Sequence, residues 1–470
     1  MPDDTTAQIQ NADTVMTASI ATNPAAGMSV RKRMIMTACL LVCVVFMLEG
    51  VLQLAAAVSP RVRVLLAPPW SAIRKAAAQP SVEPTIPDAL LEHRPRPGYP
   101  GHDARGFRNP AALKTANILA LGDSHTYGTN VAPEEAWTRQ LAQSLGEPVY
   151  NMAYGGYGPT HELALLPEAL KLRPRLILVG IYAGNDLYDC YHHVYELKAF
   201  PEFATADSVE RDRIAAAEAV EPVKQKVEGN WRALYGDLLG EESGAAPNSS
   251  ATQNNTFTAD EPPLGPRRLI SEYSKLYGLA RATKDALSGP PVEPCGVSEK
   301  RWAKLKSQAE TLPEQCAIFE TVGERTIFTP RVRFDAMNLD DARITEGYHI
   351  ALGALSVIQQ QSAAAGAKVM IVFLPTKEYV FAGVVSESGQ TLPPDYQALV
   401  TMESRFWSEL QCELAAMHIE WIDPVPALRA ALRAGEYPYP ADRDGHPTAA
   451  GHRVIARAVE NYLNTRKDAH

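Results

Sequence analysis

A serine and a histidine stand where their side chains could perform nucleophilic catalysis. Ser124 follows a short apolar run and closes the tripeptide Gly122-Asp123-Ser124. A serine hydroxyl is a poor nucleophile unless a base, a group that orients the base and donors for the oxyanion lie close to it. Taken alone, the tripeptide is better explained as an ordinary turn, because its residue types are common in turns. The rest of the chain therefore decides its role.

The last loop of the chain supplies a candidate base. His446 precedes a proline just before the terminal helix, and Asp444 stands two positions earlier. Residues two apart in an extended segment point to the same side, so Asp444 is placed to bind Nδ1 and leave Nε2 for Ser124. This gives the triad order Ser, Asp, His. Asp442 is the alternative acid, and His452 in the following helix is expected to be a packing or surface residue.

Two further strand ends carry possible donors for an oxyanion. The segment after the second strand is rich in glycine and includes Gly156. Glycine lets the backbone approach a ligand closely and can expose its N–H. The third strand ends in Gly184-Asn185-Asp186, where the Asn185 side-chain amide could donate a hydrogen bond. The alternative role for Asn185 is an Asx turn.

The apolar runs predict the elements that must bring these residues together. Short strands alternate with helices, which is the pattern of a parallel α/β sheet, and ligands bind at the carboxyl ends of such strands. We expect a three-layer α/β/α fold of the flavodoxin-like kind, with a central parallel sheet. The expected strands are 117–121, 148–152, 175–182, 367–374 and 418–422, and the main helices are 136–145, 160–172, 347–365, 396–417, 424–434 and one that ends near 463.

The amino-terminal region predicts a membrane anchor. Residues 1–30 are polar and have the composition of a disordered tail. The basic residues 31–33 precede an apolar run, 34–58, whose length suits a bilayer span and which contains Glu49 near its end. Together, 31–58 form a transmembrane signal anchor. The alternative is a signal peptide cleaved after Ala55-Ala56-Ala57.

The remaining boundaries follow from composition. Proline-rich residues 59–112 form a linker or extended arm. We assign 113–189 and 345–466 to the α/β domain and 190–344 to a partly helical insertion, with a disordered loop near 242–263. A helix over 269–287 would line a groove or pack on the core. Cys295 and Cys316 could form a disulfide if the domain is exported.

Bulk composition excludes some classes of function. The 470 residues carry a net charge of −9, which argues against a nucleic-acid-binding surface. The six cysteines include no C-x-x-C pair, so neither a zinc site nor a thioredoxin-like motif is expected. We expect no metal and no organic cofactor.

The motifs together resemble the SGNH (GDSL) hydrolase superfamily. The resemblance covers roughly 113–189 and 345–465 and is carried by blocks in the family's order: Gly122-Asp123-Ser124, Gly156, Ala183-Gly184-Asn185-Asp186 and Asp444-Gly445-His446. Ala183 replaces the first glycine of the third block. The segments Gly106-Phe107-Arg108 and Pro375-Thr-Lys-Glu378, with the apparent anchor, resemble a membrane-anchored bacterial branch that includes exopolysaccharide O-acetyltransferase and esterase domains.

The resemblance implies roles for these residues. Ser124 would be the nucleophile, His446 the base and Asp444 its partner, with the oxyanion held by Ser124 N–H, Gly156 N–H and the Asn185 amide. The common family spacing is D-x-x-H, and Arg443 occupies the acid's position here. A D-x-H spacing is found among relatives that acetylate bacterial exopolysaccharides, which favours Asp444.

These features predict a serine esterase that acts on O-acyl esters, with a small molecule or cell-envelope carbohydrate as substrate. The domain would lie outside a bacterial inner membrane that the chain crosses once. An O-acyltransferase with the same triad is the first alternative. A carbohydrate-binding scaffold protein without activity is the second, and the altered Asp–His spacing is the feature that favours it.

Overall fold

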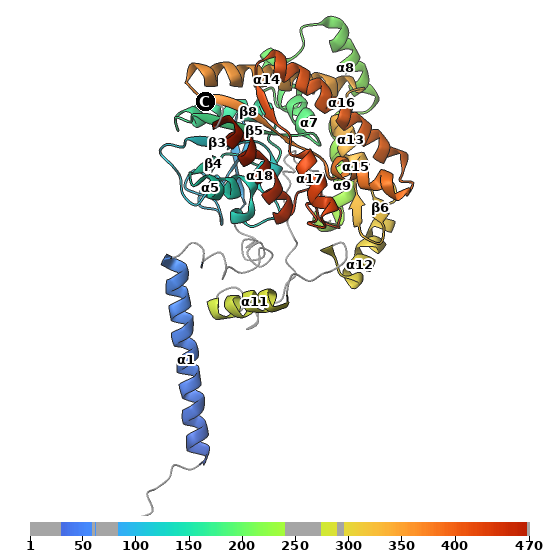
Figure 1. The fold of residues 1–470 in the computed structure, drawn as a ribbon. Coiled ribbons are helices and arrows are strands. Elements are labelled where there is room, and N and C mark those ends of the chain that lie inside the picture. Colours follow the sequence, from blue (N-terminus) through green and yellow to red (C-terminus); the bar gives the residue numbers. More distant parts are fainter. Residues whose placement is uncertain (1–29, 59–61, 63–82, 240–273, 289–295, 468–470) are drawn as a thin grey trace, which may run out of the picture.

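Five parallel strands form the central sheet of the computed structural model, which describes residues 30–58, 62, 83–239, 274–288 and 296–467 (Figure 1). The strands lie in the order β4-β3-β5-β8-β9. Their bounds are β3 Ile118–Leu121, β4 Val149–Asn151, β5 Leu176–Tyr182, β8 Lys368–Leu374 and β9 Glu420–Ile422. All neighbouring strands run parallel, so their carboxyl ends share one edge, as the sequence predicts.

Side chains alternate between the two faces of this sheet. In β3, Leu119 and Leu121 join one apolar cluster, whereas Ile118 and Ala120 join the other. Both faces are buried because helices cover each of them, which explains the nearly uninterrupted apolar strands. The first face is covered by α6 Pro159–Leu170, α7 Asp186–Tyr191, α14 Ala342–Ala364 and α16 Pro394–Ala416. The second is covered by α5 Trp137–Leu145, α15 Lys377–Ser388, α17 Val425–Arg433 and α18 Ala449–Lys467. The expected three-layer fold is confirmed.

The arm that precedes the sheet is folded from residue 83 onward. Strands β1 Thr85–Asp88 and β2 Glu92–Pro95 form an antiparallel hairpin. Phe107 is fully buried, and the guanidinium of Arg108 donates to the carbonyls of Gly128 and Val131. The part of the expected arm from residue 83 onward therefore packs against the α/β domain.

The insertion adds helices and a second hairpin. Its elements are α8 Ser208–Val220, α9 Val223–Leu239, α12 Glu299–Glu310, β6 Ala317–Glu320, β7 Arg325–Phe328 and α13 Pro330–Met337. A separate apolar cluster joins all of these except α8 and includes Leu234, Trp302 and Val332; Ile214 of α8 packs in the main cluster instead. The expected loop near 242–263 and Cys295 lie outside the described residues, so the disulfide stays a prediction; Cys316 is buried.

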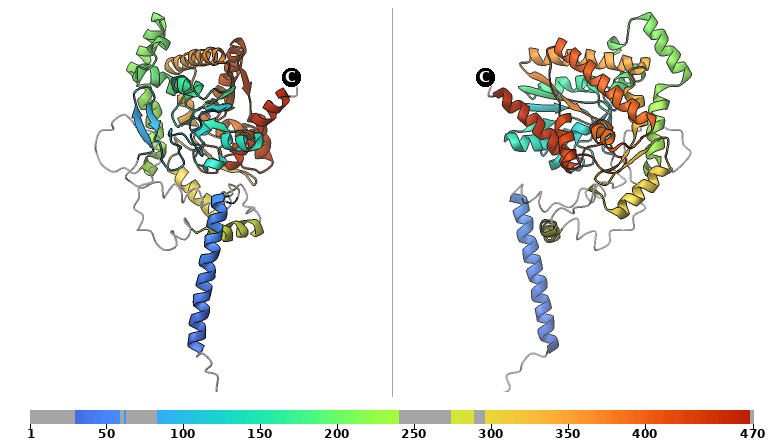
Figure 2. Two further views of the ribbon diagram at one scale, coloured as in Figure 1. Left: turned by 90° about the vertical axis from the view of Figure 1, so that its left-hand side faces the viewer. Right: turned by 45° about the vertical axis from the view of Figure 1, so that its right-hand side comes forward.

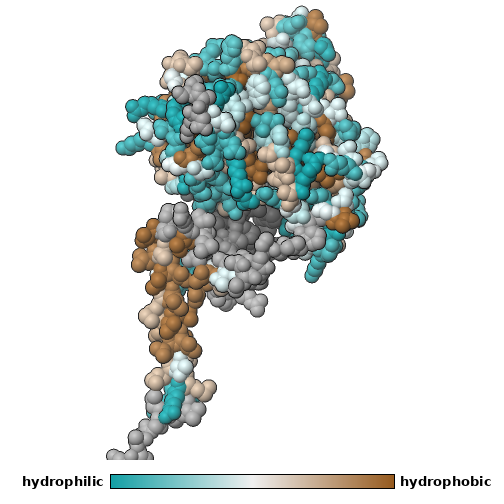
Figure 3. All heavy atoms as spheres, viewed as in Figure 1, coloured by the Kyte–Doolittle hydropathy of each residue, from teal (hydrophilic) through white to brown (hydrophobic). Residues whose placement is uncertain are grey.

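Two helices stand apart from the α/β domain (Figures 1 and 2). Helix α1, Val30–Val58, is largely exposed, and beyond the basic residues at its start it is mostly apolar (Figure 3). Its segment Arg31–Val58 is long and apolar enough to cross a membrane. Helix α11, Lys275–Ser288, lies against α1. It does not pack on the core, which is one of the two roles expected for a helix at 269–287; the other, lining a groove, stays a prediction.

Candidate active site

Ser124 lies where β3 meets the short helix α4, Ser124–Tyr127, and it is buried. The chain turns sharply at Gly122, whose φ is 146°. A Cβ at this position would lie 2.5 Å from Thr126 Oγ1, so the turn requires glycine. Asp123 caps α4 by accepting a hydrogen bond from the His125 N–H at 2.9 Å. The Gly-Asp-Ser sequence therefore fixes the serine at the carboxyl edge of the sheet.

The final loop brings His446 to Ser124. His446 Nε2 lies 2.9 Å from Ser124 Oγ, and Nδ1 lies 2.7 Å from Asp444 Oδ1. The same carboxylate oxygen accepts the His446 backbone N–H at 3.0 Å. A carboxylate at Nδ1 favours the tautomer with its hydrogen there, which leaves Nε2 to accept the serine proton. The structure thus connects the serine hydroxyl, the imidazole and the carboxylate by two consecutive hydrogen-bond contacts.

The two candidate acids have different contacts. The Asp444 carboxylate contacts His446 Nδ1, whereas Asp442 Oδ1 accepts a hydrogen bond from the Asp444 backbone N–H at 3.1 Å. Asp442 Oδ2 is 3.4 Å from the Arg301 guanidinium. His452 is buried and its Nδ1 accepts the Trp137 N–H at 3.2 Å, so it packs inside the domain.

The environment of Asp444 keeps its carboxylate ionised. Burial alone would raise the pKa of Asp444, but the charge and hydrogen bonds of His446 and the charge of Lys377 lower it to about 2. The second carboxylate oxygen accepts a hydrogen bond from the Asn130 side chain. Asn130 has a left-handed φ of 68°, which asparagine tolerates. Its role was not predicted from the sequence, because 314 positions separate it from Asp444.

A buried lysine supports the loop that carries the acid and the base. Lys377 is fully buried, and its ammonium donates to the carbonyls of Asp442 at 2.6 Å and Pro440 at 3.3 Å. Burial lowers its pKa. The sequence did give one signal for this residue, since a charged side chain three positions after the end of the buried strand β8 needs a polar partner if it is buried.

An aromatic stack lies behind the histidine. The His125 ring stacks on Tyr182 with centroids 3.7 Å apart, and its centroid lies 4.7 Å from that of His446. Burial lowers the pKa of His125 well below its usual value, and the neighbouring His446 charge lowers it further. A neutral ring therefore covers one side of His446. Sequence reasoning missed His125, because nothing at that position distinguishes it from a core histidine.

The expected oxyanion donors differ in their surroundings. Among the described residues, no acceptor lies within hydrogen-bond distance of the Ser124 or Gly156 N–H. The loop after β4 runs beside Ser124, with the Tyr154 N–H donating to the Gly122 carbonyl at 3.2 Å. Asn185 instead donates its side-chain amide to Asp189 Oδ2 at 2.6 Å. An amide nitrogen carries two hydrogens, so this bond leaves Asn185 one further donor.

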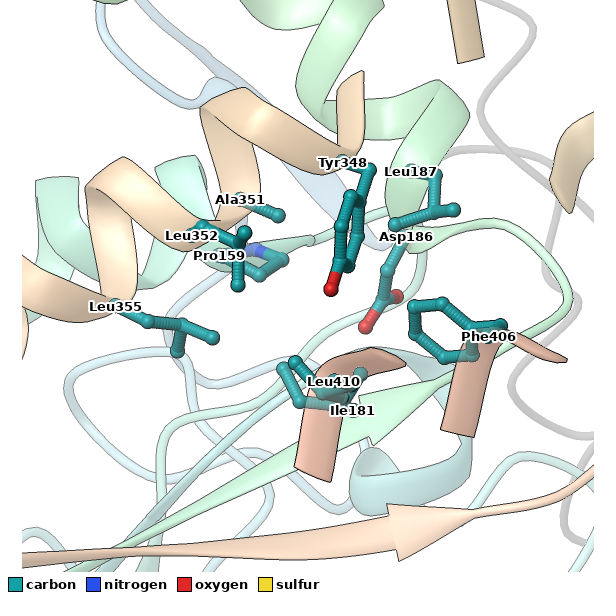
Figure 4. Close-up of a pocket in the computed structure, with 10 residues that line it drawn as sticks. All are labelled: Pro159, Ile181, Asp186, Leu187, Tyr348, Ala351, Leu352, Leu355, Phe406 and Leu410. Carbon is teal, nitrogen blue, oxygen red and sulfur yellow. The ribbon is translucent and has the colours of Figure 1, made fainter. Parts of the chain in front are cut away.

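A small cavity lies on the α14 side of the sheet, lined in part by Asp186, the residue after Asn185 (Figure 4). Its volume of about 10 Å³ has room for one water, and the Asp186 carboxylate and Tyr348 hydroxyl face it. Burial raises the pKa of Asp186 well above its usual value, and the neighbouring Asp123 and Glu162 charges raise it further. The cavity is too small to hold an ester substrate. In the described parts of the chain, no group of three or more His, Cys, Asp or Glu side chains is placed to hold a metal ion.

Comparison with known proteins finds similarity among solved structures only. No family model matches the chain, and no curated protein is similar to it in sequence. The similar structures include TesA (12% identity, TM-score 0.28), a protein assigned as an acylhydrolase from Bacteroides fragilis (12%, 0.27) and a GDSL-like lipase from Bacteroides thetaiotaomicron (8%, 0.27). Each alignment covers 74% of this chain. It covers 97% of TesA, 86% of the acylhydrolase and 88% of the lipase. The function proposed below rests on the geometry of the site.

The first prediction separates the two acids. If Asp444 orients His446 as the resemblance implies, Asp444→Asn removes the charge beside Nδ1, and turnover of an acetyl ester should fall by roughly three to four orders of magnitude, as it does in serine hydrolases with a Ser-His-Asp triad. Asp442→Asn keeps both backbone carbonyls that Lys377 binds and should leave turnover within about threefold. Steady-state kinetics of the two purified variants test this. Equal losses, or the larger loss in Asp442→Asn, would contradict the assignment.

The second prediction concerns acid stability. The pKa of Asp444 falls from its ordinary 3.8 to about 2 on folding, so its charge stabilises the folded chain above pH 4. That stabilisation, about 2 kcal/mol, is lost as the pH falls through about 2. Urea unfolding should find Asp444→Asn less stable than wild type at pH 6, with a smaller difference near pH 2. A difference that does not change with pH would argue against the low pKa.

Proposed function

We propose that the chain is a serine ester hydrolase that works through an acyl-serine intermediate. The single observation that supports this is the line of contacts from Ser124 Oγ to His446 Nε2 at 2.9 Å and from His446 Nδ1 to Asp444 at 2.7 Å. A buried hydroxyl that faces an imidazole, itself held by an ionised carboxylate, is the arrangement that activates serine.

The reaction follows from these positions. Ser124 Oγ attacks the ester carbonyl carbon while its proton moves to His446 Nε2. The tetrahedral intermediate expels the alcohol, which takes that proton from His446 and leaves the acyl group on Ser124. His446 then removes a proton from water, and the hydroxide releases the acid and restores the serine. Asp444 stays ionised and stabilises the imidazolium in both steps.

The oxyanion is held by backbone donors in this proposal. The N–H groups of Ser124 and Gly156 have no acceptor among the described residues, so both are available to a developing negative charge. The Asn185 amide would be the third donor, using the hydrogen that does not bind Asp189. Removing one such donor typically lowers turnover by about a hundred- to a thousandfold.

The substrate class and the location are inferred from the sequence. The resemblance favours O-acyl esters of cell-envelope carbohydrate. Helix α1 would anchor the chain in the bacterial inner membrane and leave the domain on the outer side. The composition of Arg31–Val58 supports this, since one apolar helix of that length can serve as an anchor or as a signal sequence.

An O-acyltransferase is the second candidate. The D-x-H spacing of Asp444 and His446, which resembles that of exopolysaccharide acetyltransferases, favours it, and these two residues make the contact. In this reaction a sugar hydroxyl, deprotonated by His446, takes the acyl group from Ser124 in place of water. The two reactions share the first half and differ only in the nucleophile of the second.

One experiment tests the common step. The full-length protein in detergent should react with a fluorophosphonate probe, and Ser124→Ala should not. With an acetyl ester as donor, free acetate is the expected product in buffer, and the variant should form none above background. If adding a carbohydrate acceptor diverts the acetyl group onto the sugar, the protein is a transferase. A folded wild type that neither reacts with the probe nor consumes the ester would overturn the proposal in favour of a binding protein.

A further inference from the structure

Helix α1 carries a carboxylate in an otherwise apolar segment, and α11 satisfies it. The Glu49 side chain accepts hydrogen bonds from the backbone N–H groups of Lys275 at 2.7 Å and Leu276 at 2.9 Å. It also accepts the Ser274 hydroxyl at 2.8 Å and the Gln53 amide at 2.8 Å. The first-turn N–H groups of a helix lack partners within the helix, so this contact fixes the start of α11 to a defined level of α1.

Helix α11 has one apolar side. Leu279 and Ala280 follow Leu276 by three and four positions, which places the three side chains on one face. The Leu279 side chain is 37% exposed. The helix lies below the α/β domain; it runs across the direction of α1 in the left view of Figure 2 and is seen end-on in the right view. Its apolar side is therefore not covered by the domain core.

The level of Glu49 indicates what covers that side. A bilayer core of about 30 Å takes about 20 helical residues. Counted from Met34, which follows the basic residues, these reach Gln53. Glu49 then lies about one helical turn inside the boundary on the domain's side. The apolar face of an interfacial helix lies about 5–10 Å below the boundary between headgroups and acyl chains. Glu49, which binds the start of α11, lies at a similar depth.

We propose that α11 is an interfacial membrane helix, with its apolar side on the acyl chains of the leaflet nearest the α/β domain. The proposal rests on anchoring by α1. Fourteen residues are too few to cross the bilayer, so α11 lies in its surface. With α1 it would give the domain two points of attachment, which would restrict its orientation above the membrane.

Photolabelling from within the bilayer tests this. The full-length protein is reconstituted in phosphatidylcholine–phosphatidylglycerol vesicles that contain a phospholipid with a diazirine on its acyl chain. After irradiation, mass spectrometry should find lipid adducts on peptides from α1 and from 275–288. Adducts on α1 without any on α11 would overturn the inference. Adducts on neither helix would overturn the anchoring proposal itself, so the two failures are distinguishable.

A matched pair of variants sharpens the result. Leu279→Asp places a charge on the apolar side and should reduce α11 adducts by about fivefold while those on α1 stay unchanged. Leu279→Met keeps the side apolar and should label like wild type. Equal labelling of α11 in both variants would show that this side faces a protein surface, a second copy included, and would contradict the inference.

A different observation supports a second inference, about the loop that carries Gly156. The β1–β2 hairpin packs on this loop through His93, which is largely buried. His93 Nε2 lies 3.2 Å from the Gly155 carbonyl oxygen, and the Tyr157 hydroxyl donates to the His93 carbonyl at 2.7 Å. The His93 ring also contacts Tyr154 and Tyr157, with centroids 5.6 and 5.5 Å away. Because a carbonyl can only accept, Nε2 carries the hydrogen.

Peptide geometry turns this contact into a constraint on Gly156. In a trans peptide the carbonyl of one residue and the N–H of the next point to opposite sides of the chain. The hydrogen bond from His93 therefore directs the Gly156 N–H away from the hairpin. Gly156 has a φ of 77°, and glycine rotates easily, so the peptide needs such a restraint. We infer that His93 is a positioning residue that holds Gly156 as an oxyanion donor; this rests on the proposed function.

Substitutions of His93 test this role. His93→Phe keeps the aromatic packing and removes the donor, so kcat for an acetyl ester should fall about tenfold with KM within about twofold. His93→Gln restores a donor and should recover kcat to within about threefold of wild type. Tyr157→Phe is the control, because it removes the other hydrogen bond between the hairpin and the loop and leaves the His93 side chain in place. Its kcat should stay within about twofold of the wild-type value.

Two outcomes would be decisive against it. A wild-type kcat in His93→Phe, or equal losses in the Phe and Gln variants, would overturn the positioning role. Failure of the wild type to turn over ester in a Ser124-dependent way would instead overturn the proposed function, and this inference with it.

Discussion

The hydrogen bond between Ser124 and His446 depends on the approach of the last loop to the carboxyl end of β3. These residues are 322 positions apart in the chain, so no local preference can bring them together. The parallel sheet does this, because every strand of such a sheet ends at the same edge and every following loop begins there. Helix α18 then packs beside α5 on one face of the sheet, which returns the chain's end to the strand that carries the serine.

Electrostatics then separates the roles of the acids near the site. Asp444 lies against His446 and near Lys377, and its pKa is lowered to about 2 despite burial. Asp123 follows the strand directly and is fully buried, and burial raises its pKa to about 6, although His446 and local hydrogen bonds oppose this. Similar side chains thus differ in pKa because of their surroundings. The acid with the lowered pKa is the one hydrogen-bonded to the imidazole, and Asp123 serves as the helix cap.

Segments outside the sheet connect the site to its surroundings through polar contacts. The arm contacts the loop after β4 through His93 and Tyr157, and Arg333 on α13 of the insertion lies over the Tyr182 ring, 5.7 Å from its centroid. Glu49 joins α1 to α11. Buried or apolar surroundings make an unpaired polar group costly, so each of these contacts fixes the relative position of two segments. The α/β core alone would leave the loops at its edge less restrained.

The sequence by itself determined the sheet and the ends of its strands. Apolar runs such as 175–182 and the glycine-rich turns after them follow from local preferences and burial patterns, and Ser124, Asp444 and His446 could be named from types and spacing. The two-residue spacing favours Asp444 over Asp442, but only the tertiary structure shows the Asp444 carboxylate on the imidazole and Asp442 on the Asp444 backbone N–H. The tertiary structure also decided that Asn130, Lys377 and His125 surround the site and that Asn185 is held by Asp189. These are contacts between side chains from different segments, and packing, not sequence periodicity, selects them.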